Sequence, residues 1–208
     1  MMKKYSTVVL FSLISLFLFT SCSLPFGLFK PAPFEKGILE DSTYINKQAN
    51  LKIIVPEGWE AKINEDAQDS MEDAVDGADI KKDNMSFSDI DFSCMNPDTG
   101  SNFSVAYSLR PDNINFMTLI DETMKDLVKQ ATDAGLTLKQ TDSFEKVIAG
   151  HTCQVSEFEA TTNGMTITEY LCFFEVDAYI GMIAIVPNDF IDENESFDNL
   201  LGYFSAVN

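Results

Sequence analysis

His151, Cys153 and Cys172 are the side chains of this sequence best suited to bind a metal or to form a cross-link. His151 and Cys153 lie two residues apart in an apolar stretch that predicts a strand, so both side chains point to one face. If Asn163-Gly164 forms a two-residue hairpin turn, paired residue numbers sum to 327, as 163 and 164 do. Cys153 then lies diagonal to Cys172 on the same face of the sheet.

This group of one histidine and two cysteines has three interpretations. It could supply three zinc ligands, but no fourth ligand is evident and the neighbouring residues are apolar. A disulfide between Cys153 and Cys172 would suit an oxidising compartment, although it would leave Cys94 alone. We therefore expect buried free thiols beside a surface histidine, keep the disulfide as the alternative, and expect no metal.

Residues arranged for catalysis are not evident in the sequence. Glu157 and Glu159 share one face of a predicted strand, as the two carboxylates of a glycosidase can. Solvent-facing glutamates on strands are far commoner, and His151 is the only histidine that could act as a base. The chain also has no glycine-rich phosphate loop and no dinucleotide-binding motif. We therefore expect no enzyme and no cofactor.

Acidic residues crowd the segment that follows Trp59. Their positions are Glu65, Asp66, Asp69, Glu72, Asp73, Asp76 and Asp79. A calcium loop of the EF-hand type needs oxygen ligands at a spacing that this segment does not have. It predicts a solvated acidic helix or loop, with a weak cation site as the alternative.

The overall charge excludes one large class of partner. The 208 residues include 33 Asp and Glu against 14 Lys and Arg, which gives a formal net charge of −19. Nucleic acid needs a positively charged surface, so we expect no nucleic-acid binding. A hydrophobic fraction of 45% is too high for a disordered acidic chain, and the length suits one folded domain, or one domain with an anchor.

The first residues predict an export signal and a lipid anchor. Lys3 and Lys4 precede an apolar run over residues 5–19, and the small pair Thr20-Ser21 then precedes Cys22. Phe-Thr-Ser-Cys resembles the bacterial lipobox, which implies cleavage before the cysteine and attachment of diacylglycerol, and so of palmitate-type chains, to its thiol. An uncleaved membrane helix and plain secretion are the alternatives. The lipobox implies a lipoprotein on the bacterial cell membrane, held by its lipid and facing away from the cytoplasm.

These features divide the chain into three predicted parts. Residues 1–21 form the signal peptide, 22–41 the lipidated cysteine and a proline-containing tether, and 42–208 the folded domain. The prolines at Pro25, Pro31 and Pro33 oppose a helix or a central strand in the tether. Its apolar residues, Phe34 among them, either rest among lipid headgroups or pack on the domain.

The sequence of the domain predicts both strands and helices. Strand patterns occur in seven segments, namely residues 51–55, 87–94, 103–109, 146–149, 153–161, 165–176 and 179–186. Helical spacing occurs over residues 114–134 and in a C-terminal segment that carries Phe197, Leu200, Leu201 and Phe204. Ile90, Phe92 and Cys94 are expected on one face of their strand.

Several of these strands are apolar on both faces. In one of them, Leu171 and Phe173 point one way while Cys172 and Phe174 point the other. A sheet that is buried on both sides needs a covering layer on both sides. The predicted class is α+β, with a central antiparallel sheet of about seven strands flanked by helices.

The first predicted strands carry a family resemblance. Tyr44-Ile45-Asn46, followed by residues 51–59 with Pro56, Gly58 and Trp59, is similar to the opening strands and Pro-x-Gly-Trp corner of PsbP-like domains. The resemblance, which extends over about residues 42–207, implies the α/β/α sandwich that PsbP shares with Mog proteins. PsbP is a non-enzymatic extrinsic subunit, and none of its functional residues is matched here.

The expected function follows from the anchor and the fold. We expect a non-enzymatic binding or accessory module of the cell envelope, with an envelope protein as its partner. The alternative is a carrier of a small ligand or cation, which would use a pocket against the sheet or the acidic segment.

Overall fold

A computed structural model describes residues 33–67, 69, 90–111, 114–133, 136–162 and 165–207 of the chain. The predicted signal peptide, Cys22, most of the acidic segment and the hairpin turn at Asn163-Gly164 lie outside these residues. Among the helices that the structure describes, none is long and apolar enough to span a bilayer.

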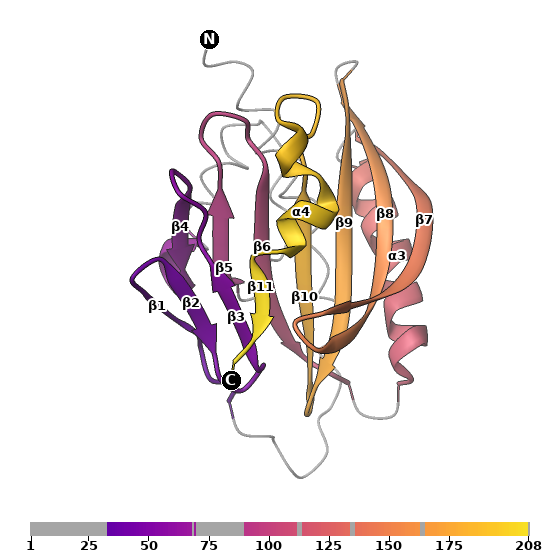
Figure 1. Cartoon of the computed structure of the whole chain (residues 1–208). Coiled ribbons are helices and arrows are strands. Elements are labelled where there is room, and N and C mark those ends of the chain that lie inside the picture. The colour runs from indigo at the N-terminus through magenta and orange to yellow at the C-terminus, as the bar shows by residue number, and fades with distance from the viewer. Residues whose placement is uncertain are drawn as a thin grey trace.

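The central element is a seven-stranded antiparallel sheet, as predicted (Figure 1). Its spatial order is β4 (Glu60–Ile63), β5 (Ile90–Met95), β6 (Asn102–Leu109), β10 (Tyr179–Val186), β9 (Met165–Val176), β8 (His151–Thr162) and β7 (Thr137–Ile148). Strands β8 and β9 pair in the expected register, with Val155 opposite Cys172 and Thr162 opposite Met165. The hairpin interpretation of the sequence is therefore confirmed by its flanking strands.

Helix α3 (Phe116–Asp133) covers one face of this sheet and agrees closely with the helix predicted over residues 114–134. Its buried apolar stripe consists of Ile120, Met124, Leu127 and Ala131. This stripe packs on the face that carries Leu171 and Phe173, where it forms the helix-side core.

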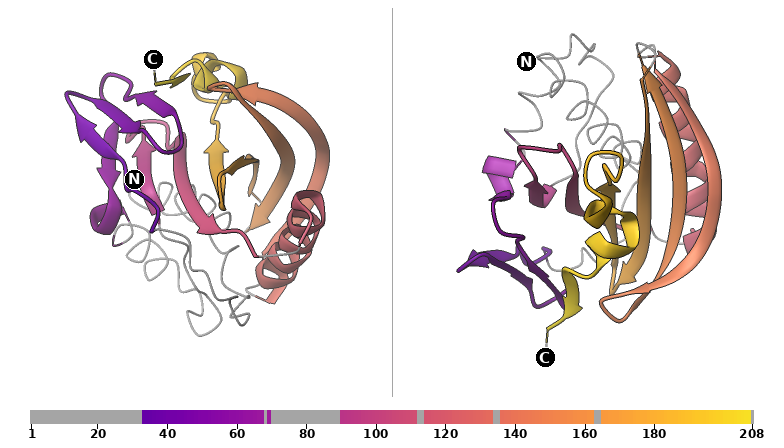
Figure 2. Two further views of the ribbon diagram at one scale, coloured as in Figure 1. Left: turned by 90° about the horizontal axis from the view of Figure 1, so that it is seen from below. Right: turned by 45° about the horizontal axis from the view of Figure 1, so that its top comes forward.

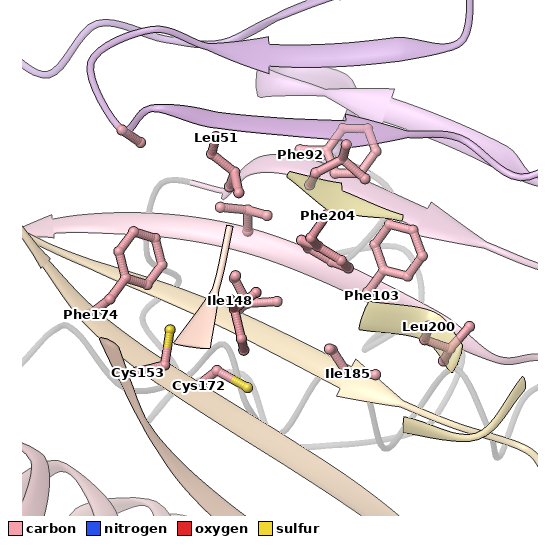
Figure 3. Close-up of a cluster of buried hydrophobic side chains, with 14 of the residues drawn as sticks. Leu51, Phe92, Phe103, Ile148, Cys153, Cys172, Phe174, Ile185, Leu200 and Phe204 are labelled. Atoms are coloured by element: carbon pink, nitrogen blue, oxygen red, sulfur yellow. The ribbon is translucent and has the colours of Figure 1, made fainter. Parts of the chain in front are cut away.

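In the part of the chain that the structure describes, the opposite face is covered by a second sheet and one short helix (Figure 2). The second sheet has the order β1 (Ile38–Glu40), β2 (Thr43–Asn46), β3 (Leu51–Ile54) and β11 (Phe204–Ala206), and the helix is α4 (Phe197–Leu201). Phe204 was expected in the C-terminal helix but lies in β11, opposite Ile53. Cys172 and Phe174 belong to the core on this side, so the two-faced pattern of the sequence is confirmed (Figure 3).

A bulge in β5 corrects one expectation. Ile90 pairs with Ala106 but Phe92 pairs with Val105, so the register shifts at Asp91. Ile90 consequently joins the helix-side core, while Phe92 faces the second sheet. A strand with strict alternation would have placed Ile90 and Phe92 on one face, and the extra residue of the bulge reverses this.

Candidate functional site

The chain enters the folded domain at a fixed point. The ring of Phe34 stacks on Tyr107 with centroids 4.1 Å apart and lies 4.9 Å from the ring of Tyr179. Glu35 N–H donates to Gln48 Oε1 at 2.8 Å. Of the two expectations for Phe34, the structure therefore shows packing on the domain, and the packed chain extends into the range 22–41 assigned to the tether.

The carboxylate of Asp91 secures this entry point from inside the protein. It is 1% exposed and accepts hydrogen bonds from Gly37 N–H at 2.9 Å, Tyr44 Oη at 2.5 Å and Asn46 Nδ2 at 2.9 Å. The bulge in β5 gives Asp91 its place between the two sheets. Burial, with a contribution from the nearby carboxylate, raises the pKa of the Tyr44 phenol well above its usual value. We infer that this cluster is structural because donors surround the carboxylate.

A groove lies between α3 and strands β7 and β8, with a volume of about 520 Å³. Helix α3 contributes an apolar wall made of Met117, Ile120, Met124 and Val128. The strands contribute a polar floor made of Gln140, Ser143, Gln154 and Ser156. Asp121 and Lys125, both exposed, also line the groove, and their opposite charges balance.

The floor of this groove is unusual for a sheet face that lies under a helix. Ser156 is buried on the same face as Phe158, which belongs to the helix-side core. Gln140 Nε2 reaches Ser156 Oγ only at 3.4 Å, which is long for a hydrogen bond. This groove is not predicted from the sequence, although the change from Gln154 and Ser156 to Phe158 within one strand face is its signal.

The structure places the histidine and cysteines together without making them a metal site. His151 Nε2 lies 2.7 Å from the carbonyl oxygen of Ala49, and its ring lies 4.6 Å from that of Phe174. The carbonyl can only accept, so Nε2 carries the proton in this contact. In the described part of the chain, no three His, Cys, Asp or Glu side chains form a group that could hold a metal.

The cysteines Cys94, Cys153 and Cys172 are free and buried. Burial raises the pKa of the Cys94 and Cys153 thiols to about 12, and raises that of Cys172 well above its usual value. Figure 3 shows Cys153 and Cys172 within the apolar core. A disulfide between Cys153 and Cys172 stays the alternative to these free thiols.

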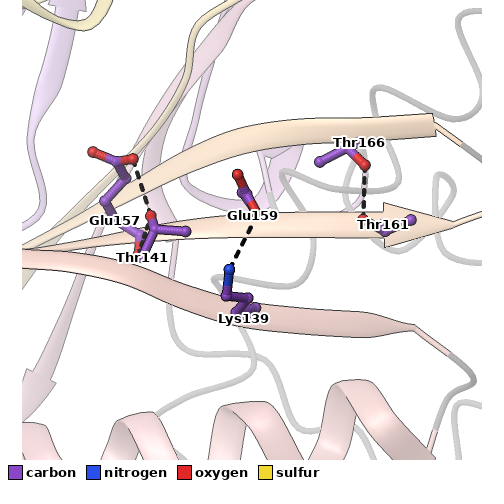
Figure 4. Close-up of polar contacts among 6 residues, drawn as sticks. All are labelled: Lys139, Thr141, Glu157, Glu159, Thr161 and Thr166. Carbon is purple, nitrogen blue, oxygen red and sulfur yellow. Dashed lines mark hydrogen bonds and ion pairs between the residues drawn. The ribbon is translucent and has the colours of Figure 1, made fainter.

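The two strand carboxylates have ordinary surface partners (Figure 4). Glu157 Oε1 accepts from Thr141 Oγ1 at 3.0 Å, and Glu159 lies 3.8 Å from Lys139 Nζ in an exposed ion pair. Of the acidic segment, the structure describes only Glu65, Asp66 and Asp69.

A further surface feature was missed from the sequence altogether. Phe190 and Ile191 follow β10 and are largely exposed. Their apolar side chains stand outside any periodic pattern, so the sequence predicts no role for them.

Comparison with known proteins relates this architecture to solved structures. No protein-family model matches the chain, and no curated protein matches its sequence. The solution structure of cyanobacterial PsbP from Synechocystis has a TM-score of 0.55 and 13% identity, and the alignment covers 88% of this chain and 100% of that one. LpqN, described as involved in cell envelope biogenesis of Mycobacterium tuberculosis, has a TM-score of 0.41 and 8% identity over 76% of this chain and 83% of its own.

The domain therefore has a PsbP-like fold, as the resemblance of its opening strands implied. In this chain the large antiparallel sheet carries α3 on one face, and the four-stranded sheet with α4 on the other. At 13% identity the likeness shows the fold alone.

Proposed function

We propose that this protein is a lipid-anchored, non-enzymatic accessory module of a bacterial cell envelope, which displays its domain outside the cytoplasm to a protein partner. The observation that carries the proposal is the fixed entry of the chain into the domain. Phe34 stacks on Tyr107, and Gly37 N–H donates to buried Asp91. A lipid at Cys22 would then be joined to the folded domain by residues 23–32.

Further support comes from the contacts and pKa values of the histidine and cysteine side chains. His151, the only histidine, contacts a backbone carbonyl. Raised pKa values keep the buried thiols Cys94 and Cys153 protonated near neutral pH, where they are poor nucleophiles. The PsbP-like fold is compatible with a binding role.

The anchor is tested by replacing the acylated cysteine. Cys22→Ala should abolish incorporation of labelled palmitate and leave either uncleaved precursor or protein outside the membrane fraction. Cys94→Ala is the matched control, since it removes a buried thiol and should keep the label. Labelled, membrane-bound Cys22→Ala protein would contradict the proposal.

The groove under α3 supports a second candidate function, that of a small-ligand carrier. Its lining combines the amide of Gln154, whose Nε2 donates to Glu145 Oε1, with the hydroxyl of Ser156 and the thioether of Met124. Thioethers adapt to varied apolar shapes, and neutral amides match neutral hydroxyl or amide groups. The chemistry favours an uncharged amphipathic ligand.

Native mass spectrometry of the purified full-length protein tests this second function. We expect a small neutral molecule to remain bound, and Gln154→Leu to reduce its occupancy because the floor then loses a donor and an acceptor. Gln130→Leu on α3, outside the groove lining, is the control. Equal occupancy in both variants would exclude the groove as the site.

A further inference from the structure

The loop between β10 and the short helix η3 (Glu193–Glu195) displays Phe190 and Ile191 to solvent. Phe190 is 90% exposed and Ile191 is 64% exposed. Large aromatic and aliphatic side chains that protrude together are typical anchors of protein interfaces.

Hydrogen bonds hold this loop in one conformation. The carbonyl oxygen of Asn188 accepts from Ile191 N–H at 3.0 Å and from Asp192 N–H at 3.2 Å. Asn188 Nδ2 donates to the carbonyl oxygen of Thr99 at 2.7 Å, which ties the loop to the turn between β5 and β6. In Figure 1 the loop lies at the end of the molecule where β10 finishes.

A buried carboxylate links the end of this loop to the turn between β5 and β6. Glu195 is 6% exposed and accepts from Thr99 Oγ1 at 2.5 Å and from Asn96 Nδ2. The loop is thus ordered before any partner binds. Binding of a partner over Phe190 would therefore cost little free energy for ordering the loop.

The charges around the loop indicate what kind of partner it fits. All charged residues between Pro187 and Leu201 are acidic. Glu195 is buried and Asp198 pairs with Lys146, so the acidic rim beside Phe190 consists of Asp189, Asp192 and Glu193. Such a rim is repelled by anionic lipid headgroups and by a second copy of this acidic chain. It attracts lysine and arginine side chains.

We propose that Phe190 and Ile191 insert into an apolar pocket of a partner protein whose rim carries lysine or arginine. The inference rests on the proposed function and names the surface by which the anchored module reaches its envelope partner. Phe190 enters the pocket, while Asp189 and Glu193, both exposed, pair with the basic rim.

Site-specific photo-cross-linking in cells that produce the full chain tests this docking surface. Benzoylphenylalanine replaces Phe190 and, as a matched control, Val147, which is 68% exposed on β7. We expect one protein adduct from position 190 and none from position 147. The adduct identifies the partner, which is then purified and titrated against the detergent-solubilised full chain.

In that titration Phe190→Ala should weaken the affinity at least about tenfold. Asp189→Asn should weaken it about threefold and reduce its dependence on salt. Both side chains are exposed, so the thermal midpoint of each variant should match that of the parent protein.

Other outcomes would overturn the proposal. These are an adduct with a second copy, with lipid or within the same chain, an affinity unchanged by Phe190→Ala, or no adduct specific to position 190. A failure of the proposed lipid anchor can be distinguished from a failure of this docking surface. Loss of palmitate from the parent protein would leave its titration with the purified partner unaffected.

Discussion

Asp91 connects the start of the domain with both sheets. Its carboxylate joins the start of the domain at Gly37, the second sheet at Tyr44 and Asn46, and its own strand β5. A buried carboxylate is tolerated only where donors replace the water it has lost. Three donors do so here.

Asp91→Ala should lower the free energy of unfolding by about 3 kcal/mol, because three buried donors lose their acceptor. Tyr44→Phe removes one donor alone and should cost about 1–2 kcal/mol. Urea denaturation measures both variants against Asp126→Ala, an exposed control on α3. A midpoint for Asp91→Ala equal to that of the control would show that the cluster contributes nothing.

The buried thiols and phenols should make the stability of the protein depend on pH in the alkaline range. Burial raises the pKa of Cys94, Cys153 and Tyr170 to about 12, and that of Tyr107 above its usual value. These groups are neutral when protonated, so the native state keeps protons that the unfolded chain releases above about pH 9. Their contribution to stability is complete below pH 9 and is lost as the pH rises toward 12.

Urea midpoints should therefore fall steadily between pH 9 and pH 11. The native protein should also react slowly with a thiol reagent at pH 8, and rapidly once unfolded. Fast reaction of Cys94, Cys153 or Cys172 in the native chain would contradict their burial.

At the scale of elements, close approach between strands depends on one glycine. Gly181 lies opposite Phe174 in the sheet, and a Cβ at Gly181 would stand 2.3 Å from the buried ring. The centroid of the His151 ring lies 4.6 Å from that of the Phe174 ring. Glycine thus allows β10 to accept an aromatic ring from β9 against its backbone.

Gly181→Ala should lower the free energy of unfolding by about 2 kcal/mol because the ring has no space to move. Phe174→Leu in the same chain should recover part of this loss. A double-mutant cycle measured by urea denaturation gives the coupling. Additive effects of the two substitutions would show that the ring and the glycine do not contact.

At the scale of the whole molecule, the dominant quantity is the net charge of −19. Exposed ion pairs such as Lys139 with Glu159 contribute little against this repulsion. Salt screens like charges on the surface, so it should stabilise the native state.

Raising NaCl from 10 to 300 mM shortens the Debye length of the solution from about 30 to about 6 Å. This change should raise the thermal midpoint of the protein by about 3 °C. Calcium chloride at matched ionic strength is the control for the cation-site alternative. A falling midpoint in NaCl would contradict the repulsion argument, and a much larger rise in calcium would indicate a specific cation site.

The sequence alone determined the elements whose side chains follow a simple period. The helix over 114–134, the register of β8 with β9 and the two apolar faces of β9 were all predicted, because burial imposes spacings of 3.6 or 2 residues on local sequence. β7 was predicted only over 146–149, since its exposed polar residues carry no such period and pairing with β8 holds them in a strand.

Only the tertiary structure decided the features that depend on contacts between distant segments. The bulge at Asp91, the second sheet that unites β1 with β11, the groove under α3 and the ordered display of Phe190 each join residues far apart in the chain. Local periodicity reports whether a side chain is buried. It does not report which segment buries it, because that depends on how all the layers pack.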